Sequence, residues 1–255
     1  NRVGGGGLAA ELSDGYNLSP TMIGLVIGSM FFAAAVVQVP VGLMLDSFGA
    51  RRTLLGLSVI AVSGMILIGF ASGAAELIIG RILVGIGHGA SITGVYLLAV
   101  VWTSPERVST VAAITIAVGG ALGGIIGTAP LAISFETFGF SATFVLLAIA
   151  SLFSSFLIWK LIDEKNSFTD KPNASEGLAG SLVGFFEVLK DRNLWPIFAM
   201  ALCFSFPFAT IGGLWASPFL QDLHKLTSVE AGGIILAMAF GVNLGTFLYL
   251  SLIHI

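Results

Sequence analysis

The sequence predicts an all-helical membrane protein, and three observations support this fold class. Of the 255 residues, 56% are apolar and only 10% are charged, whereas soluble domains carry about 25% charged residues; the mean hydropathy is +1.00. Several segments are apolar over roughly 20 residues, the length of a helix that spans a bilayer. None alternates apolar and polar residues as barrel strands do, so backbone hydrogen bonding in lipid leaves only helices. The seven predicted spans are 22–45, 53–71, 77–102, 108–133, 142–162, 194–220 and 231–250.

The spans divide the chain into two bundles and a linker. Short loops join the first five spans, so consecutive spans run antiparallel and residues 1–162 form an N-terminal bundle. Residues 163–193 are polar and predict a central loop, and residues 194–255 begin a second bundle. Within the loop, apolar residues at helical spacing predict a short amphipathic helix along the membrane surface; the alternative is a plain helical lead-in to the next span. These apolar residues are Leu182, Phe185, Phe186 and Leu189.

Lysine and arginine orient the spans, because cytoplasmic loops carry an excess of these residues. If the loop after the first span is cytoplasmic, eight basic residues lie inside and only Arg2 and Lys225 lie outside. We therefore expect the central loop to be cytoplasmic. The eight inner residues are Arg51, Arg52, Arg107, Lys160, Lys165, Lys171, Lys190 and Arg192.

The residue types argue against several other classes of function. The three histidines are scattered, no cysteine or histidine pair has metal-ligand spacing, and no glycine-rich loop leads from a strand into a helix. No run of basic residues is typical of nucleic-acid binding. We expect no enzyme activity, no cofactor, no metal and no nucleic-acid partner. The remaining alternative, a membrane enzyme, would need a catalytic cluster that this sequence does not show.

Ionisable residues within spans are costly in lipid and usually face a cavity or a partner. Arg81 and His88 lie seven residues apart in the third span, so they share one side of a helix, with Gly85 between them. Arg81 is suited to hold an anionic solute; the alternatives are a structural ion pair or an arginine that reaches the outer surface. His88 lies near mid-span and is suited to carry a proton, or else forms an interhelical hydrogen bond.

Two amides and a set of small residues complete the candidates within the spans. Gln38 and Asn243 either line the cavity or pack between helices. Small residues let helix backbones approach in lipid, so we expect close packing at a glycine stripe in the fourth span, with a hinge as the alternative. The expected packing residues are Gly85, Gly87, Gly120, Gly124, Gly127 and Pro130.

A charged cluster follows the first span. Asp46 ends that span at the C-terminal end of a helix, where a lone carboxylate is unfavourable. Arg51 and Arg52, just past a turn at Gly49, are the expected partners, and Gly42 leaves room for another helix to approach. The alternative is a basic loop that only sets the orientation.

The cluster resembles the major facilitator superfamily, whose loop between helices two and three carries a Gly-Asp-Gly-Arg-Arg pattern at the spacing of Gly42, Asp46, Gly49, Arg51 and Arg52. Ser47 departs at a position that is usually basic. Arg81, Gly85 and Gly87 are similar to the fourth-helix pattern of the family. Residues 128–132 and 213–220 are similar to stretches of bacterial sugar-phosphate and nitrate/nitrite permeases, but Gln38 stands where nitrate porters have arginine.

The resemblance implies a helical bundle that is incomplete. The spans would correspond to family helices two to eight, so the N-terminal bundle lacks most of its first helix and the last four helices are missing. Residues 251–255 resemble translated sequencing adapter, and the alternative is a genuine helix end.

The expected function is secondary active transport of a small polar or anionic organic solute by alternating access, with a proton as the candidate coupling ion. Gln38, Arg81, His88 and Asn243 would line the pathway, and the resemblance implies that the Asp46 cluster is a cytoplasmic gate. The full-length protein would work as a monomer in the bacterial inner membrane, as a symporter or an antiporter. The alternative is a transporter-like sensor that binds a solute without moving it.

Overall fold

The computed structural model describes residue 16 and residues 18–127, 129–162, 178–207, 210–211 and 215–253. Every element in these ranges is a helix, which confirms the expected fold class. The side chains of Asp46 and Asn243 lie outside the description. In chain order the helices are α2 (Pro20–Val36), α3 (Gln38–Gly69), α4 (Ala74–His88), α5 (Ser91–Trp102), η1 (Pro105–Arg107), α6 (Val108–Ile126), α7 (Ala129–Leu161), α8 (Leu178–Lys190), η3 (Arg192–Leu194), α9 (Trp195–Pro207), α10 (Ala216–His224) and α11 (Ser228–Ile253).

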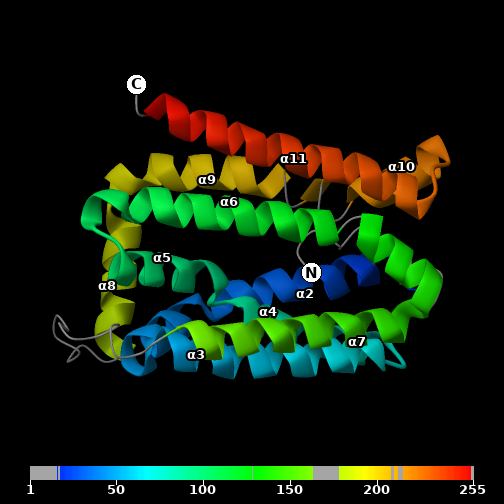
Figure 1. Cartoon of the computed structure of the whole chain (residues 1–255), viewed down its shortest axis with the longest axis horizontal. Helices are drawn as coiled ribbons and strands as arrows, with labels where there is room; N and C mark the ends of the chain where they lie inside the picture. Colours follow the sequence, from blue (N-terminus) through cyan, green and yellow to red (C-terminus); the bar gives the residue numbers. More distant parts are fainter. Residues whose placement is uncertain are drawn as a thin grey trace.

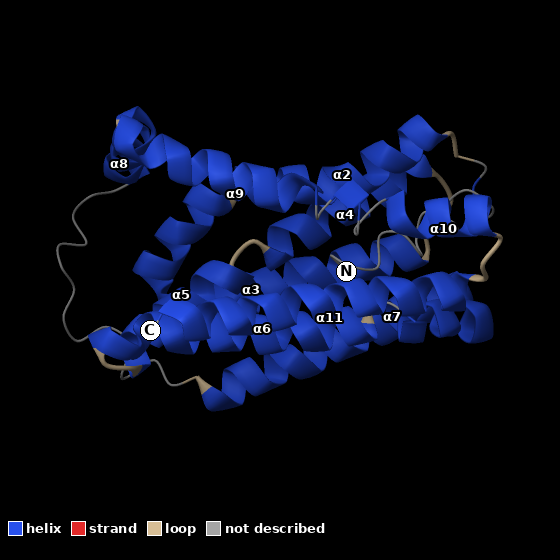
Figure 2. Ribbon diagram, turned by 90° about the horizontal axis from the view of Figure 1, so that it is seen from above, coloured by secondary structure: helices blue, strands red, loops and turns tan. Residues whose placement is uncertain are grey.

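The long helices run roughly along one direction, and α8 lies across them at one end (Figure 1). The same end holds the C-terminus of α7, whereas α10 lies at the opposite end, as Figure 2 also shows. Helix α8 falls in the segment that was expected to hold the amphipathic helix. An orientation across the spans is the one that a helix on the membrane surface requires.

Four described helical segments are long and apolar enough to cross a membrane, and a fifth span is obtained if one bent pair is counted together. The bent pair consists of Pro20–Val36 and Gln38–Leu45, which meet at 45°. The last two predicted spans, 194–220 and 231–250, include positions outside the description, so the count of seven stays a prediction. The four segments are Ser47–Gly69, Ala74–Trp102, Pro105–Ile126 and Pro130–Leu161.

The bend in the first span has a local cause. Pro40 has no backbone N–H, and its ring clashes with the carbonyl group four residues earlier, that of Val36. Val37, at the break, still donates its N–H to the Ala33 carbonyl at 3.1 Å. The span therefore changes direction beside Gln38.

Two further breaks occur at glycines. Within α3, Gly49 has φ 82° and ψ 165°, and within α7, Gly139 has φ 79° and ψ 173°. This backbone region is essentially restricted to glycine. Each glycine therefore ends one helix and lets the chain return as the next span.

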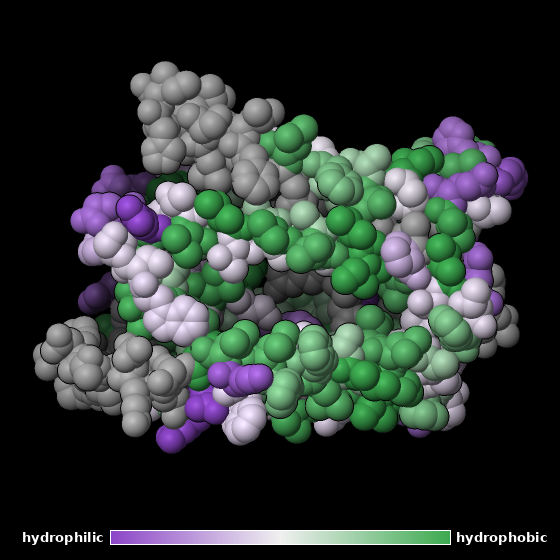
Figure 3. Space-filling view, in the orientation of Figure 1, coloured by the Kyte–Doolittle hydropathy of each residue, from purple (hydrophilic) through white to green (hydrophobic). Residues whose placement is uncertain are grey.

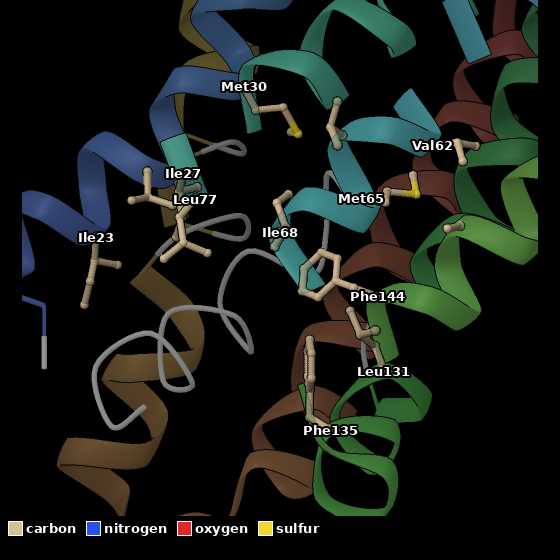
Figure 4. Close-up of a cluster of buried hydrophobic side chains, with 13 residues drawn as sticks. Ile23, Ile27, Met30, Val62, Met65, Ile68, Leu77, Leu131, Phe135 and Phe144 are labelled. Atoms are coloured by element: carbon tan, nitrogen blue, oxygen red, sulfur yellow. The ribbon is translucent and has the colours of Figure 1, made fainter. Parts of the chain in front are cut away.

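The main core joins α2, α3, α4 and α7, and its side chains interlock in Figure 4. Met30 comes from α2, Met65 from α3, Leu77 from α4 and Phe144 from α7. Many other large apolar side chains are exposed, as Phe32 is at 73%. Figure 3 shows an apolar surface between two more hydrophilic ends, which is the pattern of a protein surrounded by lipid.

Candidate solute site

Arg81 is the largest fully buried side chain in the described part of the chain. Only 2% of it is exposed. Its Nε and Nη2 atoms have no hydrogen-bond partner among the described residues. A buried guanidinium group without a partner is strongly unfavourable. The site is therefore suited to receive an anionic group.

Glycine contacts hold the helix of Arg81 between two neighbours. A Cβ atom on Gly64 of α3 would lie 2.6 Å from the Gly80 carbonyl oxygen of α4. On another side of α4, a Cβ atom on Gly85 would overlap the Met30 carbonyl group of α2. Because only glycine permits these approaches, α4 sits directly against α2 and α3. Arg81 lies one residue after Gly80 and is buried in this arrangement.

A second polar group lies where two helices are interrupted. Gln38 begins α3 beside the bend, and its Nε2 atom donates to the Gly89 carbonyl oxygen at 3.3 Å. Gly89 lies in the break between α4 and α5. Thr93 donates its hydroxyl to the Gln38 Oε1 atom at 3.4 Å. Gln38 therefore links the bend between α2 and α3 to the break between α4 and α5.

His88 ends α4, directly before this break. Its Nδ1 atom lies 2.9 Å from the Val84 carbonyl oxygen. Because a carbonyl group can only accept, the hydrogen belongs on Nδ1, and Nε2 is the nitrogen that can bind an added proton. The structure therefore places His88 next to the residue that Gln38 contacts. Arg81 lies about 10 Å away along the same side of α4.

The charged cluster that follows the first span is described only in part. Gly49 supplies the turn, and the Arg51 guanidinium carbon lies 5.7 Å from the ring centre of Trp159 at the end of α7. Arg52 is exposed. A Cβ atom on Gly42 would meet no atom within 4 Å, so the space for a neighbouring helix is open. The expected contact between Asp46 and the arginines stays a prediction, because the Asp46 side chain lies outside the description.

Only some of the expected packing residues lie in close contacts between helices. Gly85 contacts Met30, and Gly87 contacts Ala61. In the fourth predicted span, Gly124 faces Ala239 of α11 at 3.4 Å, whereas Gly119 and Gly123 have open space beside them. Gly120 and Pro130 are exposed, and Gly127 follows the end of α6. Most of the glycine stripe is therefore not a close contact in the described chain.

Sequence reasoning missed two features of the site. Gly64 and Gly80 form a close approach of α3 to α4, and their matching positions in adjacent spans were the available signal. In the sequence Thr93 is one of several hydroxyl residues within the spans, and nothing there predicts its hydrogen bond to Gln38. Asn243 belongs to α11, and its side chain lies outside the description.

The apolar helices, with an arginine buried between them, define an integral membrane protein. The family model that matches residues 5–254 is that of the Major Facilitator Superfamily. The chain therefore belongs to the major facilitator superfamily.

The relatives of the chain are named as transporters. The chain is 28% identical to the hexuronate transporter of Bacillus subtilis (strain 168), over 89% of this chain and 54% of that protein. It is 23% identical to a probable sugar efflux transporter of Haemophilus influenzae (strain 86-028NP), over 91% and 55% respectively. A shorter match, 37% identical, joins it to sodium-dependent phosphate transport protein 1 of Mus musculus over 35% of this chain and 20% of that protein.

The chain spans about half the length of the two curated relatives that cover most of it. The family and the apolar helices make it an integral membrane protein, and the bacterial relatives agree with an inner-membrane location. The names of these relatives also agree with the expectation that it is not an enzyme.

Proposed function

We propose that the protein is a secondary transporter that moves a small anionic organic solute across the membrane by alternating access. The observation that carries this proposal is the buried Arg81 side chain with two unpartnered nitrogen atoms. A guanidinium group presents N–H donors in a planar fork that matches a carboxylate or a phosphate. A bound solute would supply the missing acceptors.

The names of the relatives agree with a charged or polar solute. A hexuronate is a sugar that carries a carboxylate, and a relative of that name covers most of the chain. The solute would bind Arg81 through its anionic group. Its hydroxyl groups would find partners at Gln38 and Thr93, whose side chains lie at the break between α4 and α5.

The transport cycle requires that the site open to one side of the membrane at a time. Figure 3 shows a hollow between α6 and α7 on one face. We propose that the Asp46, Arg51 and Arg52 cluster closes the cytoplasmic end of the pathway, as the family motif implies. We also propose that His88 carries a coupling proton on Nε2, because its Nδ1 atom already donates to Val84.

The test is solute uptake into proteoliposomes by the protein encoded by the complete reading frame. We expect saturable uptake of a sugar acid such as a hexuronate and little uptake of the matching neutral sugar. Arg81→Gln should reduce kcat/KM by about 10- to 100-fold, since a hydrogen bond to a charged group contributes about 1.5–3 kcal/mol. Arg107→Gln, which changes an exposed arginine in η1, is the matched control and should leave uptake unchanged.

Two outcomes would contradict the proposal. Equal uptake by the wild type and Arg81→Gln would show that Arg81 does not bind the solute. Saturable binding of the solute with no flux in the wild type would instead indicate a sensor.

A further inference from the structure

Two turns of the chain repeat one pattern. The first reads Asp46-Ser47-Phe48-Gly49 and the second reads Glu136-Thr137-Phe138-Gly139. Each has an acid, a hydroxyl residue, a phenylalanine and a glycine in the same order. A threonine follows each glycine by four residues, at Thr53 and Thr143. One copy of the pattern lies at the break within α3, and the other lies at the break within α7.

The two turns also share their conformation. Gly49 has φ 82° and ψ 165°, and Gly139 has φ 79° and ψ 173°. Thr53 and Thr143 are each 1% exposed. Thr53 donates its hydroxyl to the Met44 carbonyl oxygen at 2.8 Å, and Thr143 donates to the Gly139 carbonyl oxygen at 2.8 Å. A buried threonine therefore stands beside each break: Thr53 bonds across it to the preceding helix, and Thr143 bonds to the glycine at the break.

The turns lie at opposite ends of the bundle. In Figures 1 and 2, the bend within α3 is at the end that holds α8, and the bend within α7 is at the end that holds α10. With the orientation given by the basic residues, the Gly49 turn is cytoplasmic and the Gly139 turn is on the outer side. The repeat therefore gives each side of the membrane one acid in the same position.

The outer acid lacks the cations that accompany the inner one. Glu136 lies in the last helical turn before Gly139, where the partial negative charge of the helix end disfavours a lone carboxylate. The residues after Gly139 are Phe140, Ser141 and Ala142, at the positions of Ala50, Arg51 and Arg52. Phe140 packs on Phe144, with ring centres 4.9 Å apart. Glu136 is exposed, so a cation on another element can reach it.

The neighbouring element is α11, which packs against α7 and begins at the same end of the molecule (Figure 1). The N-terminus of a helix carries partial positive charge. Lys225 lies just before α11, is exposed, and has a left-handed backbone conformation, with φ 57°. Glu230 already accepts hydrogen bonds from Thr227 at the start of α11, so the cation available to a carboxylate of α7 is Lys225.

We propose that Glu136 is an outer gate residue, the counterpart of Asp46, and that it closes the outer end by engaging Lys225, beside the start of α11. This inference rests on the proposed alternating-access function. The two acids would then act in opposition. Asp46 stabilises the state that is closed inside, and Glu136 stabilises the state that is closed outside.

The test measures the two openings separately by double electron–electron resonance in the protein from the complete reading frame. Every natural cysteine of that protein is first replaced by serine, including Cys203, which is exposed. One spin-label pair, at Ala75→Cys and Asp222→Cys, reports the outer end; another, at Ser104→Cys and Asn193→Cys, reports the inner end. All four positions are exposed. No solute is needed, so the result does not depend on knowing the cargo.

Glu136→Gln should raise the ratio of outer-open to inner-open molecules by about tenfold, the effect of losing a charge-assisted contact. Lys225→Gln should change the ratio in the same direction. Asp46→Asn should lower it, and the Asp46→Asn, Glu136→Gln double variant should return it toward the wild-type value. Glu106→Gln, an exposed inner acid outside both turns, should leave it unchanged.

An unchanged outer distance distribution in Glu136→Gln would overturn the inference. If Asp46→Asn still shifted the inner pair, the cytoplasmic gate of the proposed function would stand. If the Glu136→Gln shift occurred without any solute flux, the outer gate would be supported and the proposed transport would fail.

Discussion

At the residue scale, the proposed anion site and the proposed proton site lie apart on one helix. Arg81 is buried without hydrogen-bond partners for two of its nitrogen atoms. His88 has a fixed donor at Nδ1, directed at Val84. Because about 10 Å separates them along α4, a solute bound at Arg81 and a proton at His88 can occupy their sites together. Their occupancies can then be coupled through the position of α4.

Loss of the proposed proton site should abolish accumulation of the solute and leave solute exchange intact. In His88→Asn, a pH gradient should no longer drive uphill uptake, whereas exchange of labelled for unlabelled solute should continue. The measurement is uptake into proteoliposomes at a series of external pH values. His224→Asn, which changes an exposed histidine in α10, is the control. A wild-type pH profile in His88→Asn would remove the proton role.

At the element scale, α4 depends on glycines that face two different helices. Gly80 and Gly87 face α3, and Gly85 faces α2. Such contacts are favourable in lipid because dispersion between closely packed backbones replaces the hydrophobic effect. The breaks beside Val37 and at Gly89 then bring Gln38 to the end of α4. The contacts of α4 with α2 and α3 therefore determine where Arg81 and Gln38 lie.

A methyl group at Gly85 should destabilise the bundle. In Gly85→Ala the added Cβ atom would overlap the Met30 carbonyl group, and overpacking costs about 1–3 kcal/mol. Gly28→Ala is the matched control, because a Cβ atom there would meet nothing within 4 Å. It should be neutral or stabilising, since alanine favours a helix. Thermal unfolding in detergent measures both, and equal Tm values would contradict the packing role of Gly85.

Local pattern predicted the helices and the shared side of Arg81 and His88, because helical periodicity depends only on nearby residues. It could not predict the bond from Gln38 to Gly89, which joins residues 51 positions apart. Glycine spacing also gave an incomplete answer. The stripe in α6 is mostly open, whereas Gly64 and Gly80 are in close contact, because a small residue permits an approach but does not specify the partner.

At the scale of the whole molecule, the two ends of the bundle are chemically different. The end that the basic residues predict to be cytoplasmic has α8 across it and Arg51 against Trp159. The outer turn is packed by aromatic rings, with Tyr16 and Phe135 on either side of Phe140. The two ends of the first bundle therefore differ, with a cation–π contact at one end and aromatic packing at the other.

The orientation can be tested by labelling from each side. In a background in which every natural cysteine, Cys203 included, is serine, Val183→Cys in α8 should react with an impermeant maleimide only in inside-out vesicles. Asp222→Cys in α10 should react only in intact cells or spheroplasts. Both positions are exposed, so access to the membrane side decides the result. The opposite labelling pattern would reverse the orientation and move both proposed gates to the other side.

The burial of Arg81 also bears on how the protein is made. A charged residue within a span costs about 2.5–3.5 kcal/mol when the translocon releases that span into lipid. Helices α2 and α3 precede α4 in the chain, and they are the helices that its glycines contact. Cotranslational insertion can therefore deliver α4 onto partners that are already in the membrane. The ribosome therefore synthesises α2 and α3, which pack against α4, before it synthesises Arg81.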